Sequence, residues 1–390
     1  MHYSNMINPD RLPERINQVV DQTLSEKRLA GAVIKVAIDG KVIYSRAAGY
    51  ADRELNLAMQ EDALFRLASV SKPITSTAAL VLVAQGRLSL DDRVDHWLPE
   101  FQPRLGNGEI AAVTIRHLMT HTAGLTYRFF QEEGGSYEQA DVSDGMDQPG
   151  ITLEENLRRI ASVPLLYTPG TKWRYSIATD VLGAVIARVT GSTLSEAIHS
   201  LVTRPLGMND TGFVAVDPQR LTTAYADDVP GLRPLANPDG LAFVEGTAGF
   251  RLAPGRALDH TAYPSGGAGM TGSAGDFLQL LETLRKGGAP LLPESLVHEM
   301  TTNQIGDLPM PYWPGRGFGL GITVLKDPIA ADTAESPGTW RMGGTYGHSW
   351  FVDPEQRLSV VAFTNTALEG MSGPFTVDLC NAVYGRLNKE

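Results

Sequence analysis

A serine and a lysine lie three positions apart in the stretch FRLASVSKPIT, residues 65–75. In a helix, Ser69 and Lys72 would lie on the same face, because residues at i and i+3 are neighbours on a helix surface. Pro73 suits the first helical turn, where a backbone N–H has no partner inside the helix. The residues that follow, ITSTAALVLVAQG, are mostly apolar and end at a glycine that can terminate a helix. The stretch therefore predicts a hydroxyl and an amine together at the positive end of a buried helix.

Two later segments carry groups that could join the same chemistry. In YTPGTKWRYSIATDVLG, residues 167–183, Tyr175 follows a Pro-Gly turn and a tryptophan and precedes an apolar helix. In GTWRMGGTYGHSW, residues 338–350, two glycines come just before a strand, where the backbone could approach a ligand closely. A serine is a poor nucleophile until a base removes its proton, so these groups favour covalent acyl transfer.

Together the three segments resemble the serine β-lactamase and penicillin-binding-protein superfamily. Three motifs of that superfamily have counterparts here. The segment Ser69-Val70-Ser71-Lys72 resembles its first motif, S-x-x-K; Tyr175-Ser176-Ile177 resembles its second motif, and Met342-Gly343-Gly344 its third. Four more segments also resemble that superfamily, and they are GRLSLDDRVDHWLPEF (86–101), IRHLMTHTAGL (115–125), RPLGMNDTGF (204–213) and GGAGMTGSAGDFLQLL (266–281). The resemblance thus spans most of the chain.

Two departures from the superfamily pattern narrow what the resemblance implies. Class C β-lactamases carry Tyr-x-Asn and Lys-Thr-Gly, whereas here Ile177 and Met342 take the positions of the asparagine and the lysine. Methionine cannot attract a substrate carboxylate as lysine would. The pattern is closer to the family VIII carboxylesterases, whose third motif is typically Trp-Gly-Gly, although Met342 departs from that tryptophan as well. The resemblance implies a serine carboxylesterase acting on neutral esters, transesterifying when an alcohol replaces water, without a cofactor.

The resemblance also implies a role for each residue of the site. Ser69 would be the nucleophile, and Lys72 and Tyr175 would share its proton as a coupled pair in which either one could be the formal base. The backbone N–H groups of Ser69 and Thr345 would form the oxyanion hole. The expected substrate-binding residues are Tyr127, Met342, Gly343, Gly344 and His348.

Three of these positions have open alternatives. Tyr127 lies with Phe129 and Phe130 in the loop after HTAGL, and these aromatic residues could line the cleft or simply pack on the helical part. His348 could face the pocket or be a histidine satisfied within its strand. Met342 could contact the substrate or point into the core of the sheet.

The order of the elements predicts an α/β fold of the α+β type. Two β-branched runs flank Asp39-Gly40, a strong hairpin pattern, and residues 317–327, 345–353 and 357–365 predict three more strands. Apolar residues at helical spacing predict an N-terminal helix and, from Phe375 to Leu387, a final one. We expect a class C β-lactamase-like arrangement, with an antiparallel sheet flanked by helices plus a mainly helical domain. The expected sheet domain comprises residues 1–65 and 286–390, the helical domain residues 66–285, and the active site lies at their interface.

Composition excludes several classes of function. A net charge of −11 and a pI near 5.3 argue against a nucleic-acid surface. The longest apolar run, AALVLVA at 78–84, is far shorter than the roughly 20 residues that span a membrane. The first residues show no secretory signal, and the single Cys380 excludes an internal disulfide, so we expect a cytoplasmic protein. Its expected partner is a small-molecule ester, and its oligomeric state stays open.

Other functions were weighed against the esterase. No G-x-S-x-G nucleophile elbow occurs. His117 and His121 have the i, i+4 spacing of zinc ligands but lack the H-E-x-x-H glutamate, so we expect no metal site. The alternative within enzymes is a β-lactamase or D-peptidase. The alternative outside enzymes is a non-catalytic sensor or scaffold, against which the intact Ser69, Lys72 and Tyr175 weigh.

Overall fold

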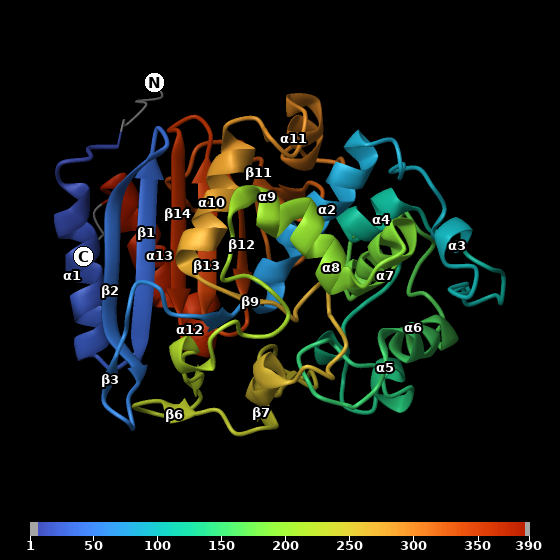
Figure 1. Cartoon of the computed structure of the whole chain (residues 1–390), viewed down its shortest axis with the longest axis horizontal. Helices are drawn as coiled ribbons and strands as arrows, with labels where there is room; N and C mark the ends of the chain where they lie inside the picture. The colour runs from blue at the N-terminus through green and yellow to red at the C-terminus, as the bar shows by residue number, and fades with distance from the viewer. Residues whose placement is uncertain (1–6, 387–390) are drawn as a thin grey trace.

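An eight-stranded antiparallel sheet forms one end of the protein, and a group of helices forms the other (Figure 1). The computed structural model describes residues 7–386. The strand order is β10-β11-β12-β13-β14-β1-β2-β3. The bounds of these strands are β1 Gly31–Ile38, β2 Lys41–Asp52, β3 Leu57–Ala58, β10 Arg316–Phe318, β11 Thr323–Leu325, β12 Trp340–Gly344, β13 His348–Asp353 and β14 Leu358–Thr364. Because β1 pairs with β14, strands from the two ends of the chain meet in the middle of the sheet.

The hairpin predicted at Asp39-Gly40 is confirmed. β1 and β2 pair in antiparallel fashion up to Ile38 and Lys41, and φ is 55° at Asp39 and 81° at Gly40. Positive φ at both central residues is the geometry of the tight hairpin turns that match the twist of the strands.

The strand predicted over residues 317–327 is wrong. The structure folds this stretch into two short strands, β10 and β11, joined by a tight turn in which Gly321 has φ of 90°. The apolar alternation continues through the turn, so the pattern does not reveal the break.

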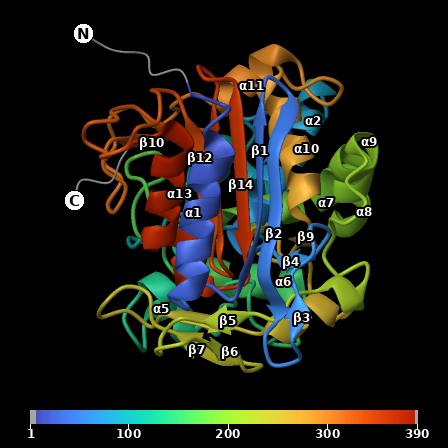
Figure 2. The same cartoon turned by 90° about the vertical axis from the view of Figure 1, so that its left-hand side faces the viewer.

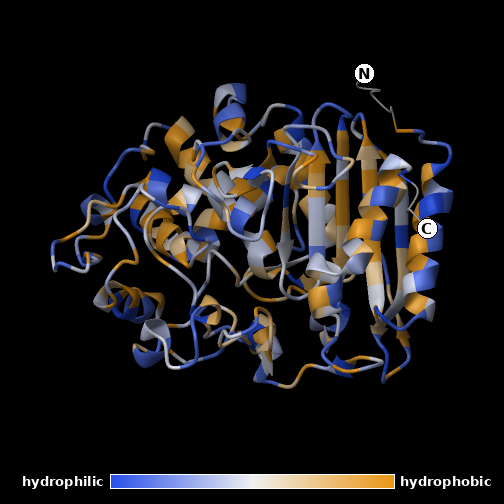
Figure 3. Cartoon of the chain, turned by 180° about the vertical axis from the view of Figure 1, so that it is seen from behind, coloured by the Kyte–Doolittle hydropathy of each residue, from blue (hydrophilic) through white to orange (hydrophobic). Residues whose placement is uncertain are grey.

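Helices cover both faces of the sheet. α1 (Leu12–Ser25) and α13 (Pro374–Tyr384) pack on each other and on one face, as Figure 2 shows. α10 (Ala274–Arg285) packs against β14 and β1, although the sequence analysis grouped its residues with the helical domain. The strands are largely hydrophobic, while α1 carries both hydrophilic and hydrophobic residues along its length (Figure 3). The two predicted terminal helices are confirmed, and Leu387 lies outside the described residues.

A buried helix, α2 (Ser71–Ala84), forms the centre of the helical part. Every residue from Ser71 to Leu82 is buried, as expected for a helix that is apolar on all sides. It packs against α7 (Ala178–Thr190), and α7 packs against α4 (Ile115–Thr120). The remaining helices are α3 Val94–Trp97, α5 Ser136–Gln139, α6 Leu153–Ser162, α8 Leu194–Ile198, α9 Arg204–Leu206, α11 Glu294–Met300 and α12 Ala367–Ser372.

Three further sheets have two short strands each. They are β4 Phe65–Arg66 with β9 Thr271–Gly272, β5 Tyr225–Ala226 with β6 Arg233–Pro234, and β7 Asp239–Leu241 with β8 Phe250–Leu252. Within residues 7–386, no single helix has the length and apolarity to cross a membrane, and one bent pair, 178–190 with 194–206, meets those two criteria.

Gly344, the last residue of β12, lies so close to the segment before α2 that a side chain has no room. A Cβ there would lie 2.6 Å from the carbonyl oxygen of Leu67. We expect Gly344→Ala to lower the free energy of unfolding by about 1–3 kcal/mol, because overpacking forces the backbone to shift. Chemical denaturation measures the change. Gly106→Ala is the matched control, since nothing lies within 4 Å of its Cβ position. Equal stability of the two variants would contradict the close approach.

Candidate active site

Ser69 lies on a 3-10 turn, Ala68–Val70, that leads directly into α2. The turn is tight, because Ala68 has φ of 46° although it is not a glycine. β4 holds the preceding residues through its pairing with β9, and the Arg66 guanidinium donates to the carbonyl oxygens of Pro254 and Thr222. The turn therefore presents Ser69, which is only half-buried, at the N-terminal end of a buried helix.

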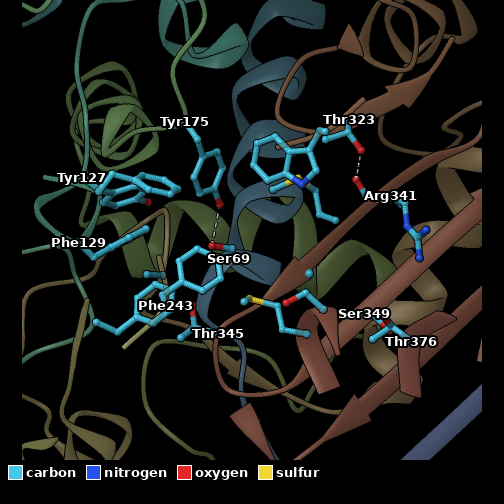
Figure 4. Close-up of a pocket in the computed structure, with 18 of the residues that line it drawn as sticks. Ser69, Tyr127, Phe129, Tyr175, Phe243, Thr323, Arg341, Thr345, Ser349 and Thr376 are labelled. Atoms are coloured by element: carbon cyan, nitrogen blue, oxygen red, sulfur yellow. Dashed lines mark hydrogen bonds between the residues drawn. The ribbon is translucent and has the colours of Figure 1, made fainter. Parts of the chain in front are cut away.

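The predicted trio of Ser69, Lys72 and Tyr175 comes together in the structure. The Tyr175 hydroxyl donates to Ser69 Oγ at 2.7 Å (Figure 4). Lys72 Nζ lies 3.1 Å from the same oxygen. Tyr175 reaches the serine from the segment just before α7, which packs on α2. One serine oxygen thus contacts both groups that could remove its proton.

The amine of Lys72 is completely buried among uncharged partners. Besides Ser69, it donates to the Tyr127 hydroxyl at 2.8 Å and to the Gly267 carbonyl oxygen at 2.9 Å. Burial lowers the pKa of Lys72 to about 7, although the charges of Asp180 and Asp144 oppose this shift. The amine can therefore be neutral, and so able to accept a proton, near pH 7.

The position of Gly267 is fixed by a buried carboxylate. The N–H of Gly267 donates to Asp180 Oδ1 at 2.8 Å, and Ser265 Oγ donates to the same oxygen at 2.7 Å. Burial raises the pKa of Asp180. Asp180 thus orients the carbonyl group that binds Lys72 without hydrogen bonding to the amine itself.

Burial acts in the opposite direction on the phenols, raising the pKa of Tyr175 and of Tyr127. Both side chains are therefore protonated where Lys72 is neutral. Tyr175 can donate a hydrogen bond to Ser69 and pass a proton onward, while Lys72 is the group with the available lone pair.

Two backbone N–H groups at the site lack an acceptor. Among the hydrogen bonds of residues 7–386, neither the N–H of Ser69 nor that of Thr345 finds a partner. Both residues line the pocket, and they lie close together in Figure 4. Free N–H groups beside a nucleophile can stabilise the oxyanion of a tetrahedral intermediate.

The pocket beside Ser69 has a volume of about 280 Å³. Tyr127 and Phe129 stack with their ring centres 4.6 Å apart, and Phe129 contacts Phe250. The aromatic residues that line this side are Tyr127, Phe129, Phe130, Phe243 and Phe250, with Tyr175 and Trp313 beside them. This side of the pocket suits an apolar substrate group.

Most of the predicted substrate-binding residues line the pocket. Tyr127, Met342 and Gly343 belong to its wall. Tyr127 is only 2% exposed and contacts Lys72, so it is neither an open lid residue nor a residue that only packs. Met342 lies on the wall although it is just 9% exposed, so it does not point only into the core. Gly344 instead faces the Leu67 backbone, where it allows the close approach of β12.

The prediction that His348 binds substrate is wrong. Its side chain is fully buried, and its Nε2 lies 2.6 Å from the carbonyl oxygen of Arg66. Its ring packs against Phe65 and Phe363. Burial lowers its pKa to about 4, so it is neutral. It is the buried strand histidine that the sequence left as the alternative, with Nε2 paired and Nδ1 without a partner.

The two histidines with zinc-like spacing have structural partners. His117 Nδ1 accepts the Thr114 N–H in a capping box of α4, and His121 Nδ1 accepts the Ser176 N–H. No cluster of three or more metal-binding side chains occurs in the part of the chain that the structure describes. His121 thereby fixes the backbone next to Tyr175.

Sequence reasoning missed several residues of the site. Asp180 is hidden in an apolar helix pattern, and Gly267 takes part through its carbonyl group, which every residue type has. Trp313, Arg316 and Phe243 lie in or next to loops with no motif. Arg341 could have been found, since it directly precedes the third motif.

Comparison with known proteins gives consistent relatives. A family model described as Beta-lactamase matches residues 16–377. Esterase EstB of Burkholderia gladioli is 50% identical over 378 residues, which cover 96% of each chain. Lovastatin esterase of Penicillium rubens is 27% identical over 389 residues, covering 90% of this chain and 92% of that protein. The solved structure of EstCE1, a hydrolase with promiscuous acyltransferase activity, matches with a TM-score of 0.95 and 46% identity, covering 97% of this chain and 99% of that chain.

The lowered pKa of Lys72 predicts how the reactivity of Ser69 depends on pH. The rate of phosphonylation of Ser69 by a fluorophosphonate should rise with pH, with a midpoint near 7, because only the neutral amine accepts the serine proton. Below the midpoint the rate should fall about tenfold per pH unit. In the unfolded chain the amine keeps its proton up to about pH 10.4, so Lys72 also makes the free energy of unfolding rise with pH between these values.

Asp144 is the control for this experiment, because burial raises its pKa to about 7 as well. Its carboxylate accepts the N–H groups of Arg128 and Phe129 and makes no contact with Ser69. Asp144→Asn should keep a midpoint, moved only toward lower pH, because the Asp144 charge raises the pKa of Lys72. A rate that is flat between pH 5 and 9, or a midpoint that disappears in Asp144→Asn, would show that Lys72 is not the group responsible.

Proposed function

This chain belongs to the beta-lactamase family, and we propose that it is a serine carboxylesterase that forms an acyl-enzyme on Ser69. One observation carries the proposal: the Tyr175 hydroxyl donates to Ser69 Oγ at 2.7 Å, and the same oxygen lies 3.1 Å from Nζ of a buried Lys72, whose amine is neutral near pH 7 and can then accept the serine proton. The esterase relatives support the same reaction class.

In the first half of the reaction, Ser69 Oγ attacks the ester carbonyl carbon. Its proton passes to the pair formed by Lys72 and Tyr175, which act as one unit because both contact the same oxygen. The free N–H groups of Ser69 and Thr345 stabilise the oxyanion, and loss of one such donor typically costs about 10²–10³ in rate. The C–O bond to the alcohol then breaks, and the pair returns the proton to the leaving alkoxide.

In the second half, a water molecule attacks the acyl-enzyme and the same pair removes its proton. An alcohol in place of water gives a new ester, so the site can also transesterify. The acyltransferase activity of EstCE1 supports this extension. Every step uses groups of this chain and needs no cofactor.

The residues at the second and third motifs favour esters over β-lactams and peptides. Ile177 is fully buried and offers no amide to a substrate, and Met342 offers no charge. These differences support the assignment to the family VIII carboxylesterases. The cytoplasmic location expected from the single Cys380 stays a prediction, as does the division into domains. Burial raises the pKa of the Cys380 thiol to about 12.

Removal of the nucleophile should abolish ester hydrolysis. Ser69→Ala deletes one hydroxyl from a half-buried position, so the protein should fold normally while losing turnover of p-nitrophenyl esters by several orders of magnitude. Mass spectrometry of wild-type protein treated with an organophosphate should locate the adduct on Ser69. An active alanine variant, or an adduct on another residue, would overturn the assignment.

The proton pair should show non-additive effects. Lys72→Ala and Tyr175→Phe should each reduce kcat by orders of magnitude, while the double variant should lose far less than the product of the two effects, since the residues act as a unit. Turnover of one p-nitrophenyl ester by all four proteins measures this. Independent, multiplicative losses would mean that the two residues carry out separate steps.

A further inference from the structure

The pocket has a second side that is polar and positively charged. Figure 4 shows Arg341, Ser349 and Thr376 across the site from Tyr127 and Phe129, with Ser69 between the two groups. The residues that line this side are Arg316, Thr323, Arg341, Ser349, Ser372 and Thr376, and we call them the cationic arm. They come from β10, β11, β12, β13, α12 and α13.

The cationic arm carries two guanidinium groups but one carboxylate. Arg316 Nη2 lies 2.7 Å from Glu335 Oε2, and Arg341 Nη1 lies 3.1 Å from Glu335 Oε1. Within residues 7–386, neither arginine forms an ion pair with any other carboxylate. The side chain of Glu335 is 0% exposed, that of Arg316 8% and that of Arg341 23%, so one positive charge is left without a carboxylate at the pocket wall.

The hydrogen-bonding capacity of the two guanidinium groups is mostly unused. Arg316 Nη1 is buried without a partner, and no N–H of the Arg341 side chain donates an aligned hydrogen bond to a described residue. The contact between Arg341 and Glu335 is one of charge alone, because Glu335 Oε1 accepts no aligned hydrogen bond. Unsatisfied donors on buried charged groups are costly unless a ligand pairs with them.

Hydroxyl groups complete the arm. Ser349 Oγ makes no hydrogen bond to any described residue, although the side chain is only 6% exposed on the pocket wall. Thr376 Oγ1 already donates its proton to the Gly373 carbonyl oxygen, so Ser349 is the hydroxyl of this pair that can donate to a ligand. The guanidinium groups and the Ser349 hydroxyl donate hydrogen bonds around one space, as recognition of a planar carboxylate requires.

We propose that the cationic arm binds a carboxylate carried by the ester substrate, at the end distant from the reacting carbonyl group. The inference rests on the proposed esterase function and names a substrate class for it, namely half-esters of dicarboxylic acids and esters of hydroxy acids. Neutral esters still react at Ser69, because the arm does not touch the reacting atoms.

The positive charge of the cationic arm can attract an anion only at short range, since the protein as a whole repels anions. The net charge is −11, and so a carboxylate-bearing substrate gains nothing from the overall field. The third motif does not attract the carboxylate either, because Met342 is uncharged. Recognition of an anion must therefore come from Arg316 and Arg341.

Methyl half-esters of dicarboxylic acids of graded length test the proposal, each compared with the methyl alkanoate of equal chain length. Acid release is followed by pH-stat titration. At the length that reaches the cationic arm, kcat/KM should be about tenfold to a hundredfold higher for the half-ester, the range expected for a hydrogen bond to a charged group. Acetates of hydroxy acids, compared with acetates of alcohols, test the same arm from the alcohol side.

Arg341→Gln removes the surplus charge and leaves Arg316 paired with Glu335. The preference for the half-ester over the alkanoate should fall at least tenfold in this variant, and Arg341→Lys should restore part of it. Arg285→Gln is the matched control. Arg285 is likewise ion-paired to one carboxylate, Glu282, and is 8% exposed against 23% for Arg341, but it does not line the pocket, so its removal should leave the preference unchanged.

Inhibition of the wild-type protein keeps the test decisive if Arg341→Gln fails to fold. Dicarboxylates of the preferred length should compete with a neutral ester more strongly than monocarboxylates of equal length. The proposal is overturned if no carboxylate-bearing ester, with the carboxylate on the acyl or the alcohol side, has a higher kcat/KM than its neutral counterpart and dicarboxylates do not compete. It is also overturned if Arg341→Gln and Arg285→Gln show the same preference for the half-ester. Neutral esters would then still be hydrolysed, so this failure differs from a failure of the esterase function, in which Ser69→Ala would remain active.

Discussion

The burial of the Lys72 amine is the constraint on which the rest of the site depends. An ammonium group removed from water is costly unless a carboxylate pairs with it, and here its three hydrogen-bond partners are a serine, a tyrosine and a backbone carbonyl group. The two buried carboxylates nearby, Asp180 and Asp144, act through their charge without hydrogen bonding to the amine. Burial and the two carboxylate charges together hold the pKa of Lys72 near 7. Ser69 therefore has a neighbouring base that is unprotonated near neutral pH.

The fold supplies each of these partners from a different place in the chain. The 3-10 turn before α2 carries Ser69 and α2 carries Lys72. The segment before α7 carries Tyr175, the loop after α4 carries Tyr127, and the stretch after β12 carries Thr345. Because Gly344 has no side chain, β12 can approach the turn before α2 closely. This approach brings the N–H groups of Ser69 and Thr345 to the same pocket. The sheet and the helical part therefore have to pack in register before any chemistry is possible.

What could be predicted from the sequence was local or carried by motifs. Ser69 and Lys72 share a helix face through their spacing alone, and the hairpin at Asp39-Gly40 follows from its turn residues. The burial of Tyr127 and the contribution of Asp180 depend on tertiary packing, which spacing does not reveal. His348 was misplaced because the face on which a strand residue lies depends on register. The surplus charge of Arg316 and Arg341 emerges only when the sheet brings three distant residues together.

Direct titration of Lys72 tests the central claim, that a neutral buried amine activates Ser69. Protein labelled with ¹³C at the lysine ε-carbons would be titrated by NMR, with Lys72→Arg used to assign the resonance. One lysine signal should titrate with a midpoint near pH 7, well separated from exposed lysines that titrate near about 10.4. If every lysine, including Lys72, keeps its proton above pH 9, the amine is charged at neutral pH and the account is contradicted.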